Sequence, residues 1–257
     1  MAFGSLAEVA RAAGTSGPSV VRLATKLGFS GFGEMKDAIQ EELSMRLAPA
    51  SDRVGARPPA DLSARVAAAD AENVLRSLES AEPSLGTVVG MLADGRRPVH
   101  IVPAAALRAV GVALCDQLSQ LREGVTLHYG PPTEVVRELA GIGNESVVVV
   151  MDTRRYERWV IEAASQARSA GASLVAVTDT PLSPLVAGSD AHLLVRVVGA
   201  GPFDSLTGAL SVVNAVAAGV AARAHKVAAT RLRRAEEALM KAGGLLDGFP
   251  MSEDGGE

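Results

Sequence analysis

The run Val147-Val148-Val149-Val150 decides the fold of the larger part of this 257-residue chain. Four consecutive apolar, β-branched residues are typical of a central strand that is covered on both faces of a parallel sheet. Similar short apolar runs occur at residues 99–102, 125–129, 173–178 and 192–198, and helical candidates lie between them at residues 105–121, 133–140 and 155–170. Strands that alternate with helices of this length predict right-handed crossovers and a five-stranded, mostly parallel α/β sheet.

Further helices flank this pattern on both sides. Residues 61–80 and 84–94 predict two helices separated by Pro83, because proline lacks a backbone donor and clashes inside a helix. The longest uncharged run, residues 205–222, has 18 residues and reaches the lower limit of a membrane span. It consists mostly of Ala, Gly, Ser and Val, with Asn214 in its middle, and therefore favours a buried helix over a membrane segment. Residues 226–241 predict a charged, solvated helix.

The composition excludes several classes of protein. Hydrophobic residues make up 48% and charged residues 21% of the chain, which rules out global disorder. The single cysteine, Cys115, excludes an internal disulfide and a cysteine-based zinc site, and four scattered histidines argue against a histidine metal site. We therefore predict neither metal nor cofactor. The net charge of −4 means that any contact with DNA must come from a local basic patch.

The chain divides at residues 49–60, PASDRVGARPPA, which have two separated proline positions and no apolar period. Such a stretch is typical of a linker. It separates a helical domain at residues 1–48 from an α/β domain at residues 61–241, and the Gly-rich, acidic residues 242–257 predict a flexible tail. The N-terminus lacks the pattern of a signal peptide, so we expect a cytoplasmic location.

Residues 6–23, LAEVARAAGTSGPSVVRL, predict a helix-turn-helix. Gly14 lies where the first helix must end, since glycine tolerates the left-handed conformation found there. Ser16 is positioned to cap the second helix, and Pro18 falls in its first turn. The expected inward stripe consists of Val9, Ala10, Ala13, Val20 and Leu23.

The outward side of the second helix predicts the contacts with DNA, made by Ser16, Gly17, Ser19, Arg22 and Lys26. Every charge between Arg11 and Lys26 is positive, whereas the acidic residues of this domain gather at residues 34–42. A basic face of this kind suits a phosphate backbone. The alternative is an ordinary helical hairpin whose Arg and Lys side chains are merely solvated.

The segment that follows, Lys26-Leu27-Gly28-Phe29-Ser30-Gly31-Phe32 and then Met35-Lys36, resembles the RpiR/MurR family of bacterial transcription regulators. The resemblance implies an all-α helix-turn-helix domain followed by a sugar-isomerase (SIS) domain with a flavodoxin-like parallel sheet. Residues 171–179 (GASLVAVTD) and 190–194 (DAHLL) are similar to the fourth and fifth strand segments of SIS domains. Family members usually carry about one more helical turn before the position of Phe3, so we expect either an abbreviated domain or further residues upstream.

The resemblance also implies a ligand site at the carboxyl ends of the strands. SIS domains hold a sugar phosphate there with serine-rich loops after the first and third strands, and neither residues 103–106 nor residues 152–157 provide such a loop. The remaining ligand candidates are polar residues of these loops and their neighbours: Asp152, Thr153, Arg154, Arg155, Thr178, Asp179, Ser183 and Ser205. We expect Arg154 and Arg155 to lie at a helix start and to clamp a carboxylate or phosphate. Alternatively, they pair with Asp152, Glu157 or a partner subunit.

Three further residues suit packing better than chemistry: His128, Trp159 and Cys115. We predict no catalytic residue. The sequence thus predicts a transcription regulator that binds a double-stranded DNA operator and forms a homodimer or tetramer through residues 205–222 and 226–241. Its SIS-like domain is a candidate sensor of a small anionic metabolite. Two alternatives stay open, a sugar-phosphate isomerase and a dimeric DNA-binding protein without a ligand.

Overall fold

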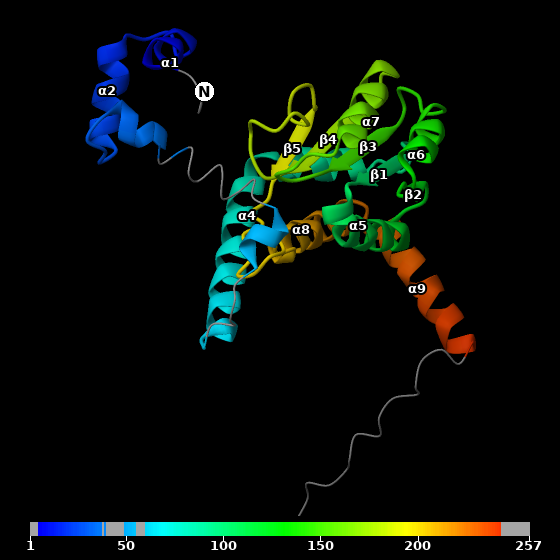
Figure 1. Cartoon of the computed structure of the whole chain (residues 1–257). Helices are drawn as coiled ribbons and strands as arrows, with labels where there is room; N and C mark the ends of the chain where they lie inside the picture. The colour runs from blue at the N-terminus through cyan, green and yellow to red at the C-terminus, as the bar shows by residue number, and fades with distance from the viewer. Residues whose placement is uncertain (1–4, 38, 40–48, 55–59, 243–257) are drawn as a thin grey trace, which may run out of the picture. The chain divides into compact units, whose positions relative to one another are not determined.

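A computed structural model describes residues 5–37, 39, 49–54 and 60–242. The chain forms two compact units, Met1–Arg57 and Pro58–Glu257 (Figure 1). The predicted tail from residue 243 onward, residues 55–59 of the predicted linker, and residues 1–4, 38 and 40–48 of the predicted first domain lie outside the described residues.

The first unit contains the predicted helix-turn-helix, with α1 at Leu6–Ala12 and α2 at Gly17–Lys26. Residues 32–37 are also helical, and Ala50–Arg53 form a short 3-10 turn, η1. Ser5 and Glu8 form a capping box that starts α1. Gly14 adopts a φ of +60° in the turn, as its position after α1 requires. The small core consists of Ala10, Val20, Ala24 and Met35.

Two residues of the predicted inward stripe face solvent instead. Leu23 is 53% exposed, because the α-helical period places Ala24, four residues after Val20, on the buried face. Ala13 is exposed because it is the C-cap of α1, where the chain already turns away. Ser16 is the N-cap of α2 as predicted, but its side chain makes no capping bond with the helix backbone.

The second unit contains a five-stranded sheet in the order β2-β1-β3-β4-β5, with parallel pairing throughout. This confirms the predicted fold class. The strands are β1 (Val99–Pro103), β2 (Val125–Leu127), β3 (Val147–Met151), β4 (Ser173–Thr178) and β5 (Ala191–Leu194). Every residue of β3 is buried, and Val149 pairs with Ile101 of β1 and Val175 of β4 at the centre of the sheet.

Helices cover both faces of this sheet (Figure 1). One face packs against α4 (Leu62–Ala93), α5 (Arg108–Leu121) and α8 (Thr207–Arg223). The other packs against α6 (Pro132–Leu139) and α7 (Arg158–Ser169). A 3-10 turn, η2 (Ala105–Leu107), precedes α5. The last described helix, α9 (His225–Lys241), extends away from the sheet, and Ala228 is its buried residue.

The helix α4 is continuous where two helices were predicted. Pro83 lies inside it, on the solvent-exposed side. The buried face of the same helix carries Ala81, Val88 and Leu92. Their packing against the core stabilises the helix by more than the loss of one backbone hydrogen bond at the solvent-exposed Pro83 costs. The segments on either side of Pro83 therefore form one helix.

The strand predicted at residues 192–198 ends at Leu194, because side chains of α4 bind the backbone that follows. Asn73 donates from Nδ2 to the Val198 carbonyl at 2.7 Å and accepts from the Val198 amide at 3.2 Å. Ser77 Oγ accepts from the Arg196 amide at 2.8 Å. Gly208 of α8 lies so close that a Cβ atom there would stand 2.5 Å from Ser77 Oγ. The Val195 amide still donates to the Thr178 carbonyl of β4, and residues 196–198 then follow α4 rather than β4.

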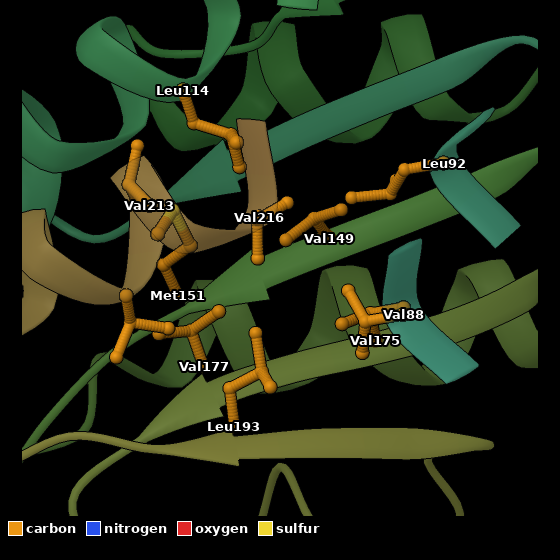
Figure 2. A pocket seen from close by; sticks show the side chains of 11 residues that line it. Val88, Leu92, Leu114, Val149, Met151, Val175, Val177, Leu193, Val213 and Val216 are labelled. Carbon is orange, nitrogen blue, oxygen red and sulfur yellow. The ribbon is translucent and has the colours of Figure 1, made fainter. Parts of the chain in front are cut away.

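A small cavity lies in the core between the sheet and its α4, α5 and α8 layer. Its lining is entirely apolar and comes from β3, β4, β5, α4, α5 and α8. Figure 2 shows these side chains. Its volume is about 10 Å³, roughly that of a single water-sized probe. An apolar void of this size is a packing imperfection, so the interior of this layer offers no room for a metabolite.

Among the described helices, no single one is both long and apolar enough to cross a membrane. Only α8 and α9 taken together meet that criterion, and they are bent by 105° at their junction. As predicted for residues 205–222, α8 packs in the core, where Val212, Val216 and Val220 are buried.

Candidate functional site

The exposed side of α2 carries a hydrogen-bonded row of polar residues. Arg22 donates from Nη2 to Ser19 Oγ at 3.0 Å, and Ser19 Oγ lies 2.9 Å from Ser16 Oγ. Lys26 follows one turn later and is exposed, as is Arg22. Gly17 is half-buried, and a Cβ there would lie 3.6 Å from Leu6. The structure therefore aligns four of the five predicted DNA-contacting residues on one face.

The second candidate site lies at the carboxyl ends of β3 and β4, where its loops are bound by carboxylates of the chain itself. Asp152 is 2% exposed, and its two oxygens accept from the amides of Thr153 and Glu157, each at 2.7 Å. Burial raises the pKa of Asp152 to about 6, with further contributions from the carboxylates of Glu157 and Asp179. Asp152 therefore holds the loop in place.

Glu157 connects this loop to the one after β1. Its Oε1 accepts from the Ala105 amide at 2.9 Å, and its Oε2 accepts from the indole nitrogen of Trp159. A free amide at Ala105 would be a donor for an anionic ligand, but here Glu157 binds it. Trp159, expected to serve in packing, lies in the first turn of α7 and is held there by this bond.

Asp179 binds the opposite side of the loop. Its Oδ1 accepts from the Tyr156 hydroxyl at 2.8 Å and from the Arg154 amide at 3.2 Å. Burial is the main cause that raises the pKa of Tyr156 to about 12. Thr178 and Ser183 are buried beside Tyr156. The predicted residues of β3 and β4 thus come together, linked by a tyrosine that the sequence analysis did not single out.

The two arginines lie in different surroundings. Arg154 has a φ of +57°, and its guanidinium lies 3.2 Å from Asp204 and donates to the Val197 carbonyl. Arg155 is exposed. The expectation that both lie at a helix start is wrong, because α7 begins only at Arg158. The bonds of Asp152 to its own loop keep residues 153–157 out of the helix.

Of two other predicted ligand residues, Ser205 and Thr153, only the first has a hydroxyl that is hydrogen-bonded within the described residues. Ser205 donates to Asp70 of α4 at 2.6 Å, outside the Asp152 cluster, and α8 begins two residues later. The hydroxyl of Thr153 is buried and has no hydrogen-bond partner within the described residues. A ligand that reached this loop could therefore satisfy the Thr153 hydroxyl, whereas Ser205 is already bound.

His128, expected to pack in a strand, lies just after β2 in a hydrogen-bonded chain. Its Nδ1 is 2.6 Å from Glu138 Oε2 and its Nε2 is 2.9 Å from His100 Nδ1. Burial, and then the neighbouring His128, lower the pKa of His100. Cys115 is half-buried, with its sulfur 3.9 Å from Ser119 Oγ. In the described part of the chain no group of three His, Cys, Asp or Glu residues could hold a metal ion.

Comparison with known proteins agrees with these two units. Residues 2–46 match the helix-turn-helix domain of the rpiR family, and residues 120–219 match the SIS domain. The sugar isomerase domain of an RpiR transcription factor from Sphaerobacter thermophilus is 27% identical, with a TM-score of 0.62 over 69% of this chain and 99% of that one. No curated protein matches the chain.

Two less similar structures share the fold. The NanR protein of Vibrio vulnificus, complexed with ManNAc-6P, is 18% identical, with a TM-score of 0.63 over 94% of this chain and 87% of that one. A protein of Escherichia coli CFT073, solved as a ligand complex, is 16% identical, with a TM-score of 0.57 over 70% of this chain and 95% of that one.

The two domains define the class of protein: a helix-turn-helix unit joined to an SIS domain with a five-stranded parallel sheet. This combination supports a transcription regulator. The chain thus carries a helix-turn-helix domain of the rpiR family followed by an SIS domain, the domain type that it shares with the RpiR transcription factor of Sphaerobacter thermophilus.

Proposed function

We propose that the protein is a transcription regulator that binds operator DNA through α2. One observation carries the proposal: the exposed row formed by Ser16, Ser19, Arg22 and Lys26 lies within the residues that match the rpiR helix-turn-helix domain. The arginine and lysine side chains suit phosphates or base edges, and the serine hydroxyls suit phosphate oxygens.

A gel-shift titration with DNA from upstream of its own gene tests this proposal. Arg22→Ala combined with Lys26→Ala should weaken binding and reduce the salt slope by about one unit for each phosphate contact that is lost. Arg96→Ala is a matched control, because Arg96 is an exposed arginine of the second unit whose side chain pairs with Asp94. Equal affinity of the double variant and the wild type would refute the role of α2.

The second unit is proposed to sense a small anionic metabolite at the carboxyl ends of β3 and β4. The exposed Arg155 and the unsatisfied hydroxyl of Thr153 support such a site. The bonds of Asp152, Glu157 and Asp179 to the same loops count against an isomerase-like phosphate cradle, because they take up the amides that a cradle would use. A rise of the melting temperature with a metabolite, lost in Arg155→Ala, would support sensing. No rise with any phosphorylated or carboxylated metabolite would favour a ligand-independent DNA-binding protein.

An isomerase would require a placed acid or base as well as a phosphate cradle. Asp152 has the raised pKa of such a group, but both of its oxygens accept backbone amides. We therefore favour a regulator without catalysis. Turnover of a sugar phosphate by the purified protein, abolished in Asp152→Asn, would reverse this preference.

Pairing of two copies completes the proposal, because a single helix-turn-helix reads only a few base pairs and a dimer reads two half-sites. The helix α9 supports pairing, since it exposes four large apolar side chains, Val227, Leu232, Leu239 and Met240. A regulator of this kind acts in the cytoplasm, where its DNA lies. Sedimentation at micromolar concentration should give at least a dimer, and a monomer would contradict this part of the proposal.

A further inference from the structure

A cavity lies at the amino-terminal edge of the sheet, the edge opposite to the candidate sensing site. Its volume is about 430 Å³, within the range of about 300–1,000 Å³ that is typical of small-molecule pockets. It opens between the turn that joins α5 to β2 and the first half of α9. The lining residues are Gly95, Arg122, Glu123, Lys226, Val227, Thr230, Arg231 and Arg234.

The lining of this cavity is strongly cationic. Lys226, Thr230 and Arg234 follow one another at intervals of four residues and thus share one face of α9, with Arg231 next to them. Glu123 is the one carboxylate of the lining, and it contacts Arg231 Nη1 at 2.9 Å. The side chain of Glu123 is 86% exposed, so it can leave this contact for water at little cost.

Arg231 is incompletely bound in the cavity wall. Its Nη2 donates to the Ser119 carbonyl at 2.9 Å, which fixes the side chain. Its Nε is buried and has no hydrogen-bond partner within the part of the chain that the structure describes. Because a buried donor without an acceptor is costly, this nitrogen is suited to an acceptor that a ligand would bring.

Arg122 supplies a buried positive charge behind the same cavity. It is 3% exposed, and its guanidinium donates to the carbonyls of Leu92, Asp94, Arg97 and Glu123. Burial lowers the pKa of Arg122, while the charge of Asp94 acts in the opposite direction. Among the described residues no carboxylate forms an ion pair with Arg122, so its hydrogen bonds all go to backbone carbonyls. An anion nearby would compensate this charge.

We propose that this cavity is a second ligand site, distinct from the carboxyl-edge site, and that it binds the phosphate group of a small phosphorylated molecule. Arg231 and Arg234 would bind the phosphate oxygens, since a planar guanidinium matches them in a bidentate manner. Lys226, in the first turn of α9, would add a point charge where the helix dipole also favours an anion. Glu123 would turn outward as the phosphate enters.

The test uses the whole protein and inorganic phosphate as the probe, with sodium chloride at equal ionic strength as the reference. Phosphate should raise the melting temperature, and calorimetry should give its dissociation constant. Arg231→Gln should weaken phosphate binding about tenfold, as the loss of a charge-assisted hydrogen bond predicts. Glu123→Gln should strengthen binding, an opposite effect that a damaged fold would not produce.

Two matched variants separate this cavity from other cationic surfaces. Arg233→Gln removes an exposed arginine of α9 that does not line the cavity, and Arg155→Gln removes the exposed arginine of the carboxyl edge. Arg233→Gln should bind phosphate as the wild type does, and Arg155→Gln, which alters the carboxyl-edge site, should keep the binding that Arg231→Gln weakens. The proposal is overturned if phosphate does not stabilise the wild type, if Arg231→Gln and Arg233→Gln bind equally well, or if only Arg155→Gln loses binding.

Discussion

The two edges of the parallel sheet satisfy their loops with side chains of opposite charge. At the carboxyl edge, Asp152 and Glu157 accept the backbone amides of the loops after β1 and β3. At the amino edge, Arg122 donates to four backbone carbonyls near the starts of β1 and β2. The topology thus determines where loops converge, whereas the side chains of each edge determine which backbone groups of those loops are already bound.

The loss of one side chain should lower the stability of the protein more at the amino edge than at the carboxyl edge. Arg122→Ala removes four hydrogen bonds of roughly 1 kcal/mol each and leaves buried carbonyls without donors, so we expect a loss of about 4 kcal/mol in the free energy of unfolding. Arg96→Ala, which removes an arginine that is 90% exposed, should cost no more than about 0.5 kcal/mol. Urea unfolding measures both values. Similar losses in the two variants would remove the contrast between a buried and a solvated cation.

At the carboxyl edge, Glu157→Ala should lower the free energy of unfolding by about 2 kcal/mol, because the Ala105 amide and the Trp159 indole then lack their acceptor. Glu157→Gln keeps one acceptor oxygen and should therefore lower the free energy of unfolding by less. The same Ala variant frees an amide for a ligand and should bind anions more tightly at this edge, which calorimetry with phosphate can measure. A stable Ala variant with unchanged anion binding would show that Glu157 does not block this loop.

A further effect at the carboxyl edge should be a change in the pH dependence of stability. The folded-state pKa of Asp152, about 6, lies above the ordinary value of 3.8, so its protonated form is the more compatible with burial. Its contribution to stability is therefore full below pH 3.8 and is lost as the pH rises through about 6. In thermal unfolding, the stability of the wild type relative to Asp152→Asn should fall over this interval. Parallel profiles of the two proteins would contradict the raised pKa.

The sheet could be predicted from the sequence because each strand has a local apolar pattern. The apolar runs around Val147-Val148-Val149-Val150 indicated all five strands, and the helix-turn-helix spacing indicated α1 and α2. The errors arose where tertiary contacts override local signals. Core packing keeps α4 continuous across Pro83, and the carboxylate of Asp152 holds residues 153–157 in a loop before α7.

The two candidate sites differed in how far the sequence could predict them. The carboxyl edge follows from topology, and most of its predicted residues do come together, although the partners Tyr156 and Asp204 were missed. The amino-edge cavity was missed altogether. Arg122 and Arg231 lie far apart in the sequence, and only the bend between α8 and α9 brings them to one cavity.

The amide of Asn73, which pairs with both the N–H and the carbonyl of Val198, has a consequence for the association of copies. A peptide group in a neighbouring strand would make the same two bonds, so Asn73 takes the place of a partner strand along the segment that follows β5. At the opposite border β2 is only three residues long and offers little template for strand addition. The segment after β5 and the short β2 thus offer little template for a continuous intermolecular sheet, so we expect any pairing of two copies to use helical surfaces.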